Sequence, residues 1–205
     1  IVFIDLGGVE FDGTRTYTAG VTTVDLTHKG FRAQDATVSK VFADGLTMRN
    51  FAGEIWYNGA LPGYHEELSN CLFENSPQSA LNPNGAGTGV YFNVRAGNSP
   101  IAAEVVGGKG RRFIACEFFN ATSNCTFLGG AAGDGSFHSG YSYSYPWRQP
   151  DRDPPWIEFD GCTFDRVNAI TLLGSFIRGN YTAIDSPTDL TSTGKQTDIN
   201  LALEY

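Results

Sequence analysis

A short phrase recurs along this chain and limits the architectures that it can adopt. The phrase is a small or apolar residue, any residue, a large apolar residue, any residue, and often asparagine. Clear copies read LTMRN at 46–50, CLFEN at 71–75 and CEFFN at 116–120, with weaker copies at 125–127 and 162–166. The first two copies lie 25 residues apart, and the steps from Cys71 to Cys116 and from Cys116 to Cys162, 45 and 46 residues, are close to two such units. A fixed period of roughly 20–50 residues is typical of a solenoid, in which each unit buries its apolar face by stacking on its neighbours.

The units are built from short strands that alternate inward and outward, bounded by Gly, Asn, Asp or Pro. A propeller blade needs four antiparallel strands and about 40 residues or more, which the 25-residue step does not supply. We therefore predict an all-β chain, a parallel β-helix in which Met48, Phe73, Phe118 and Phe164 line one interior file. Residues 1–205 would form a single domain, and we expect the chain to be a piece of a longer protein.

Asparagines follow the repeated strands at one phase, at Asn50, Asn75 and Asn120. Two interpretations stay open here. The amides of successive turns could bond each other as an asparagine ladder, or they could be solvated turn residues, since asparagine is a frequent turn former.

The four cysteines do not have the spacing of a disulfide framework or a zinc site. Residues in one column two coils apart would have Cα atoms about 9–10 Å apart, given a strand spacing of about 4.8 Å. A disulfide needs about 4.4–6.8 Å. Only Cys116 and Cys125 are close enough in sequence to be an exception. We predict free, buried thiols and no metal site.

The charge and hydropathy of the chain exclude some partners. The formal net charge is −8, which argues against a nucleic-acid partner because phosphates need a basic surface. No apolar run approaches the roughly 18 residues of a membrane span, so we predict no membrane insertion.

The regular pattern is interrupted by a long segment, 129–155, that is rich in Gly, Ser and aromatic residues. Long loops without secondary structure in a compact fold are usually functional. Its aromatic faces could stack on sugar rings while arginines bond hydroxyls or carboxylates. The predicted substrate-binding residues are Tyr141, Tyr143, Tyr145, Trp147, Arg148 and Trp156. The alternative is that these rings are buried against the solenoid or another subunit.

Two pairs of carboxyls are candidates for catalysis. Glycosidic cleavage generally uses two carboxyls that flank the bond. Glu158 and Asp160 are two apart on a predicted strand, so they share a face at about 6.5–7 Å, the lower edge of the range for inverting enzymes. Against this interpretation, Glu10 and Asp12 make the same pattern in an earlier copy, VEFDG, as a strand-and-turn device would. The second pair is Asp151 and Asp153, which flank an arginine and could equally cap their own turn.

The stretches 46–51, 68–75 and 157–164 resemble coils of the pectate-lyase-like right-handed parallel β-helix. The opening stretch, 3–13, resembles the start of that helix in bacteriophage tailspikes and related secreted polysaccharide enzymes. The resemblance covers most of the chain except 129–155. It implies a right-handed β-helix with a long aromatic-rich insertion, and it supplies no catalytic motif that can be matched residue by residue.

The resemblance implies that the chain is a phage tailspike-like protein that binds an extracellular or cell-surface polysaccharide. It also implies a place in the virion tail or outside the cell. We further predict a homotrimer, because a solenoid of this type leaves open ends that need capping or association. Whether the protein is an enzyme stays open. One alternative is a secreted polysaccharide lyase or epimerase, which would use calcium; otherwise no cofactor is expected. The other is a non-enzymatic structural protein of a virion or filament.

Overall fold

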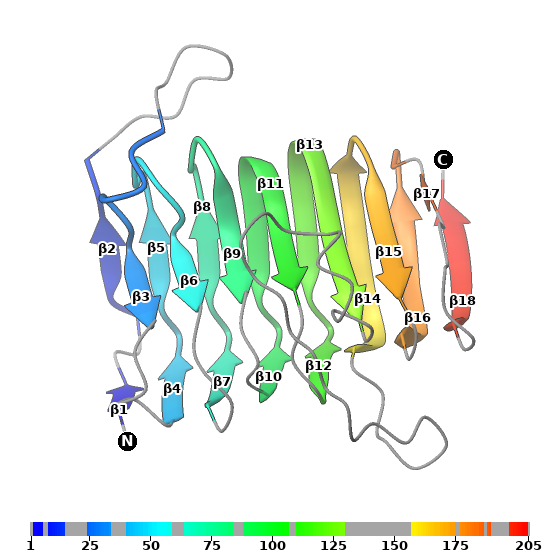
Figure 1. The fold of residues 1–205 in the computed structure, drawn as a ribbon, viewed down its shortest axis with the longest axis horizontal. Coiled ribbons are helices and arrows are strands. Elements are labelled where there is room, and N and C mark those ends of the chain that lie inside the picture. The colour runs from blue at the N-terminus through cyan, green and yellow to red at the C-terminus, as the bar shows by residue number, and fades with distance from the viewer. Residues whose placement is uncertain are drawn as a thin grey trace.

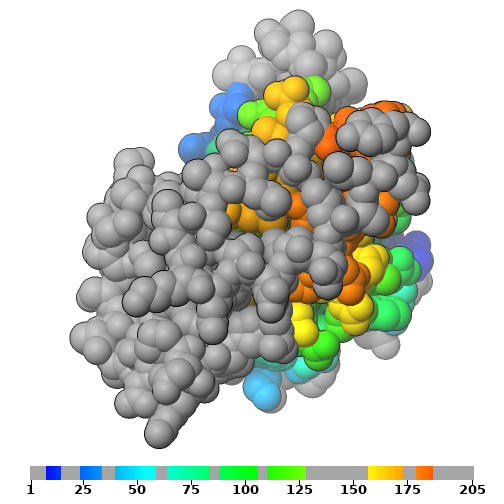
Figure 2. Space-filling model, turned by 90° about the vertical axis from the view of Figure 1, so that its right-hand side faces the viewer, coloured from blue at the N-terminus to red at the C-terminus, as the bar shows by residue number. Residues whose placement is uncertain are grey.

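The chain is all-β, with its strands joined in one parallel sheet of many strands, an arrangement consistent with a β-solenoid. The computed structural model describes residues 2–5, 8–14, 24–33, 40–58, 64–83, 88–106, 110–129, 157–174, 177–186, 188–189 and 197–204. The strands follow one another from β1 at one end of the molecule to β18 at the other (Figure 1). Seen from the β18 end, atoms of the orange coil that contains β16 stand in front of the yellow and green coils (Figure 2).

The pairings arrange the strands in three rows. The first row contains β1 (Val2–Asp5), β4 (Lys40–Asp44), β7 (His65–Ser69), β10 (Thr88–Phe92), β12 (Arg111–Ile114) and the first parts of β14 (Ile157–Val167), β16 (Ile177–Ile184) and β18 (Thr197–Glu204). The second row contains β2 (Glu10–Asp12), β5 (Thr47–Arg49), β8 (Leu72–Glu74), the starts of β11 (Arg95–Val106) and β13 (Glu117–Gly129), and the ends of β14, β16 and β18. The third row contains β3 (Phe31–Ala33), β6 (Trp56–Asn58), β9 (Ser79–Pro83), the ends of β11 and β13, β15 (Ile170–Gly174) and β17 (Thr188–Asp189).

The predicted interior file is confirmed. In the second row, Met48 is in register with Phe73, and Phe118 with Phe164, while Ala96 joins the two pairs. All of these pairings are parallel, and all five side chains are buried. Stacking of this kind stabilises the fold, because the apolar side chains of a single coil would be exposed to water on the two sides where its neighbours now lie.

The number of coils predicted between the cysteines is correct for one step and wrong for the other. Backbone hydrogen bonds connect Cys71 to Arg95 and Val94 to Glu117, so Cys71 and Cys116 lie two coils apart, as predicted. Thr163 N, however, donates directly to Cys116 O at 2.8 Å. The step from Cys116 to Cys162 is therefore one coil that contains the long insertion, and the prediction of two coils was wrong.

The prediction of free, buried thiols is confirmed for all four cysteines, but the two-coil separation behind it does not apply to Cys116 and Cys162, which lie in adjacent coils. Cys125 does not share the position of the other three, because it lies in the third row opposite Ile170. The weak copy of the phrase at 125–127 is thus a third-row strand, with an interior side chain, Phe127, that packs from another direction against Phe118 at 5.3 Å between ring centroids.

The predicted asparagine column exists and has a further member. Asn50, Asn75, Asn98 and Asn120 all have left-handed φ angles of 47–65° at the turn between the second and third rows. Asparagine tolerates this conformation better than most residues. The ladder interpretation holds for one step, where Asn120 Nδ2 donates to Asn98 Oδ1 at 2.8 Å, whereas Asn50 Nδ2 donates to Asp12.

Candidate functional site

The long insertion begins and ends at one corner of the stack. It follows β13, whose end lies in the third row, and it precedes β14, which starts in the first row. The predicted residues Tyr141, Tyr143, Tyr145, Trp147, Arg148, Asp151, Asp153 and Trp156 lie outside the described residues. Their roles stay predictions, whereas Glu158 and Asp160 can be placed.

Glu158 and Asp160 both point outward from β14. The strand alternates, with Ile157 and Phe159 buried and the two carboxyls directed away from the core. Arg112 is in register with Glu158 on the neighbouring strand, and its Nε lies 3.0 Å from Glu158 Oε2. The guanidinium thus fixes the orientation of one carboxylate, while Asp160 is exposed.

The apparent repeat of this pair at Glu10 and Asp12 is not a structural repeat. Phe11 is in register with Met48 in the second row, whereas Phe159 is in register with Phe113 in the first row. Asp12 ends β2, and its carboxylate caps the following turn by accepting bonds from Thr14 N at 2.6 Å and from Asn50 Nδ2 at 3.0 Å. The similar sequence at Glu10 and Asp12 is therefore no argument against a catalytic role for Glu158 and Asp160.

The surroundings of this pair combine apolar and charged side chains. We call the outward side of the first row the outer face. One file across it holds Phe42, Glu67, Val90, Arg112 and Glu158, and the next holds Asp44, Ser69, Phe92, Ile114 and Asp160. Phe92 leaves 48% of its surface exposed. An exposed ring beside hydrogen-bonding groups can contact the apolar face of a sugar while the polar groups bond its hydroxyls.

His65 is held on the outer face. Its ring nitrogens lie 2.7 Å from Thr88 Oγ1 and 3.0 Å from Glu67 Oε1. Residues 65–67 lie in β7, where alternation directs Glu67 outward and Glu66 inward.

The sequence did not reveal a polar cluster that is buried behind the outer face, around Glu66. Trp56 Nε1 and Tyr64 Oη each donate to Glu66 Oε2 at 3.1 Å, and Tyr91 Oη donates to Glu66 Oε1. Arg111 points inward in the same file and donates to a backbone carbonyl in β9. Glu66, Tyr91, Trp56 and Arg111 are all fully buried. Buried charges are rare unless they are paired and hydrogen-bonded.

Gly89 makes room for this cluster. It stands between Glu66 and Arg111 in the inward file, and a Cβ added there would lie 2.8 Å from Tyr91 Oη. The ring of Tyr91 therefore reaches Glu66 through the space that the side chain of any other residue at position 89 would occupy.

Burial also raises the pKa of several phenols and thiols. It is the main reason that the pKa of Cys71 rises to about 11 and those of Cys125 and Tyr181 to about 12, and it raises the pKa of Tyr91 well above its ordinary value. The unfolded chain ionises these groups first, so the stability they contribute is complete below their ordinary pKa values and is lost as the pH rises through the folded values.

We therefore expect the free energy of unfolding to fall as the pH rises from about 9, the ordinary value for a thiol, towards 12. Each unit of pKa difference corresponds to about 1.4 kcal/mol. Urea unfolding at a series of pH values would measure this fall. Cys125→Ala should make it shallower, and an equal slope in that variant would contradict the assignment to Cys125.

Within the described ranges, no group of three or more His, Cys, Asp or Glu residues is placed to hold a metal ion. No helix found in the described part of the chain has the length and hydropathy of a membrane span. The sequence matches no protein-family model, and neither a curated protein nor a solved structure is significantly similar to the chain.

Proposed function

We propose that this chain is a right-handed parallel β-helix that binds an extracellular or cell-surface polysaccharide on its outer face, as a phage tailspike-like protein. The observation that carries the proposal is the position of Glu158 and Asp160. They point outward from one strand, beside Arg112 and near the start and end of the aromatic insertion. The proposal retains the homotrimer predicted from the open ends of a solenoid, and the location in a virion tail or outside the cell that the sequence resemblance implies.

The insertion completes the proposed site. Tyr141, Tyr143, Tyr145, Trp147 and Trp156 would supply faces for stacking on sugar rings, and Arg148 would bond hydroxyl or carboxylate groups. Phe92, exposed on the outer face, is a further stacking position. Because the face is crossed by successive coils at about 4.8 Å, it offers a row of polar and apolar positions to an extended chain.

The proposed reaction is hydrolysis of a glycosidic bond by Glu158 and Asp160. One carboxyl would protonate the leaving oxygen, and the other would activate water on the opposite side of the ring. Their shared face and a spacing of about 6.5–7 Å place them at the lower edge of the separation used by inverting enzymes. Arg112 would keep Glu158 aligned through the ion pair.

Replacement of either carboxyl by its amide separates binding from cleavage. We expect Glu158→Gln and Asp160→Asn each to reduce chain shortening by about a hundredfold or more, the range for loss of an acid–base group. Both variants should still retain the polysaccharide. The assay incubates the protein with a panel of bacterial surface polysaccharides and measures retention and chain length.

Glu10→Gln is the matched control, because Glu10 has the same sequence context but lies in the second row. It should leave shortening unchanged. If chain shortening depends on calcium and produces a new double bond that absorbs in the ultraviolet, the protein is a lyase and not a hydrolase. Retention without shortening would leave a binding protein, and absence of both would reject the proposal in favour of a structural role.

A further inference from the structure

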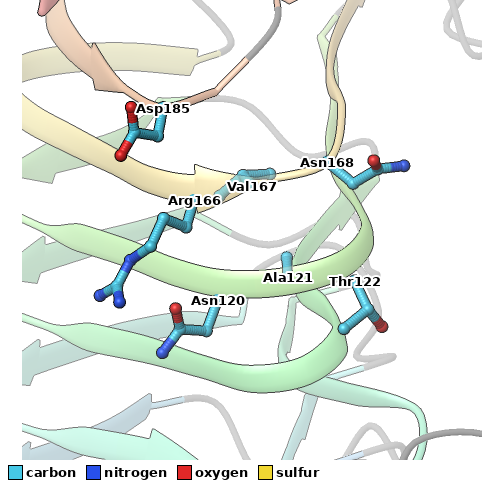
Figure 3. Close-up of a pocket in the computed structure, with 7 residues that line it drawn as sticks. All are labelled: Asn120, Ala121, Thr122, Arg166, Val167, Asn168 and Asp185. Atoms are coloured by element: carbon cyan, nitrogen blue, oxygen red, sulfur yellow. The ribbon is translucent and has the colours of Figure 1, made fainter. Parts of the chain in front are cut away.

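A polar groove lies on a different corner of the stack, between the second and third rows. It has a volume of about 390 Å³ and crosses three successive coils. Asn120 of β13, Arg166 of β14 and Asp185, just after β16, line it in turn, with Thr122 and Asn168 at its other side (Figure 3). These residues take no part in the outer face of the first row.

Arg166 breaks the asparagine column at this groove. It has a φ of 53°, in the left-handed region, at the position where the earlier coils carry asparagine. That conformation is uncommon for a residue with a long side chain, and such strained positions cluster at functional sites. Asparagine would adopt this backbone conformation more readily, so the conformation of the turn does not explain why arginine stands here.

The side chains of the groove offer both donors and acceptors. The Arg166 guanidinium bonds Asp165, with Nη2 2.6 Å from Oδ2, and it leaves 58% of its side-chain surface exposed. Asn120 directs its Nδ2 to the preceding coil, so its Oδ1 is available to the groove. Within the described part of the chain, the side chains of Asn168 and Asp185 make no hydrogen bond.

The charge of the groove limits the chemistry of its ligand. Arg166 stands between Asp165 and Asp185, whose charges both favour its protonated form and raise its pKa. An anion would be repelled by the two carboxylates. Five of the seven lining residues carry amide, hydroxyl or charged groups and two, Ala121 and Val167, are apolar, a mixture that suits a ligand with both hydroxyl groups and C–H faces.

We propose that this groove is a second binding site, for a neutral, polyhydroxylated ligand such as a segment of a neutral saccharide. Hydroxyl groups both donate and accept, which matches a lining of guanidinium, carboxylate and amide groups. The ligand would lie across the coils and contact Asn120, Arg166 and Asp185 in succession. The inference does not depend on the outer face, because the two surfaces share no residue.

The test is Arg166→Asn, which restores the asparagine of the column and removes the guanidinium. Binding of maltohexaose, cellohexaose and mannohexaose to isotopically labelled protein is followed by the backbone amide shifts of Val167 and Asn168 at millimolar ligand. We expect at least one of these sugars to move both signals in the parent chain. Loss of a charged hydrogen-bond donor should weaken that binding about tenfold or more, while the melting temperature stays equal or rises.

Arg95→Asn is the matched control, because Arg95 is also exposed and ion-paired but lies outside the groove. It should leave the groove affinity unchanged. The Glu158→Gln variant should also bind normally at the groove, which separates this site from the outer face. If none of the three sugars shifts the groove signals, or if Arg166→Asn binds as tightly as the parent, the groove is not a saccharide site.

Discussion

Replacing Phe118 by alanine is expected to lower the free energy of unfolding by about 3–5 kcal/mol, the usual cost of deleting a buried phenylalanine ring. Phe118 is fully buried in the interior file. Its ring centroid lies 5.1 Å from that of Phe164 in the next coil and 5.3 Å from that of Phe127 in the third row. Truncation would therefore open a cavity between two coils and two rows. Urea unfolding, followed by tryptophan fluorescence and circular dichroism, measures the change.

The matched control is Phe92→Ala, which removes the same ring from the outer face. Phe92 is about half exposed, so its truncation should change stability by about 0.5 kcal/mol or less. The contrast tests the assignment of Phe118 to the interior and Phe92 to the outer face, which alternation along each strand decides. Equal losses in the two variants would mean that Phe118 is not an interior residue.

The interior file could be predicted from the sequence because its signal is local and repeated. Alternation at Phe73 and Phe118 fixes which side chains share a face, and the repeat predicts that their coils stack in one file. Ala96 was missed because the coil between them lacks a large apolar residue at that position. The small side chain of Ala96 is fully buried there, in register with both rings.

The Cys116 to Cys162 step shows where a period misleads. A coil with a long insertion has nearly the same length as two plain coils, so counting residues cannot distinguish them. The similarity of the stretches at 9–13 and 157–161 misleads for a related reason. Both are alternating strands that run into an Asp-Gly turn, but the row to which each belongs is decided by its partners, Met48 and Phe113, which are distant in sequence.

Some features of the candidate site could likewise be predicted from the sequence and others could not. The outward direction of Glu158 and Asp160 follows from alternation and was predicted. The ion pair with Arg112 was not, since it depends on the register between β12 and β14. The buried role of Glu66 was hidden because three polar residues in succession, 65–67, give no sign of which one faces inward.

The buried cluster leads to the second large effect: Glu66→Ala is expected to cost about 3–5 kcal/mol, because each buried donor left without its acceptor costs about 1–3 kcal/mol. The substitution would leave the donors of Trp56, Tyr64 and Tyr91 without their acceptor. It would also leave Arg111 buried without the nearby carboxylate. Glu67→Ala, one residue away but directed outward, is the control and should be nearly neutral.

Whether Glu66 and Arg111 act as a pair is decided by a double substitution, Glu66→Leu with Arg111→Met. Replacing both charges with apolar groups of similar size removes the unmatched charge that either single variant leaves behind, and such replacements are often neutral or stabilising. We therefore expect the loss of stability in the double variant to be about 1–3 kcal/mol smaller than the sum of the losses in Glu66→Leu alone and Arg111→Met alone. Losses that simply add would mean that the two charges are satisfied separately, Glu66 by its three hydrogen bonds and Arg111 by the backbone of β9. In that case the stack would tolerate a buried arginine in this file without a carboxylate, and the space at Gly89 would serve Tyr91 alone.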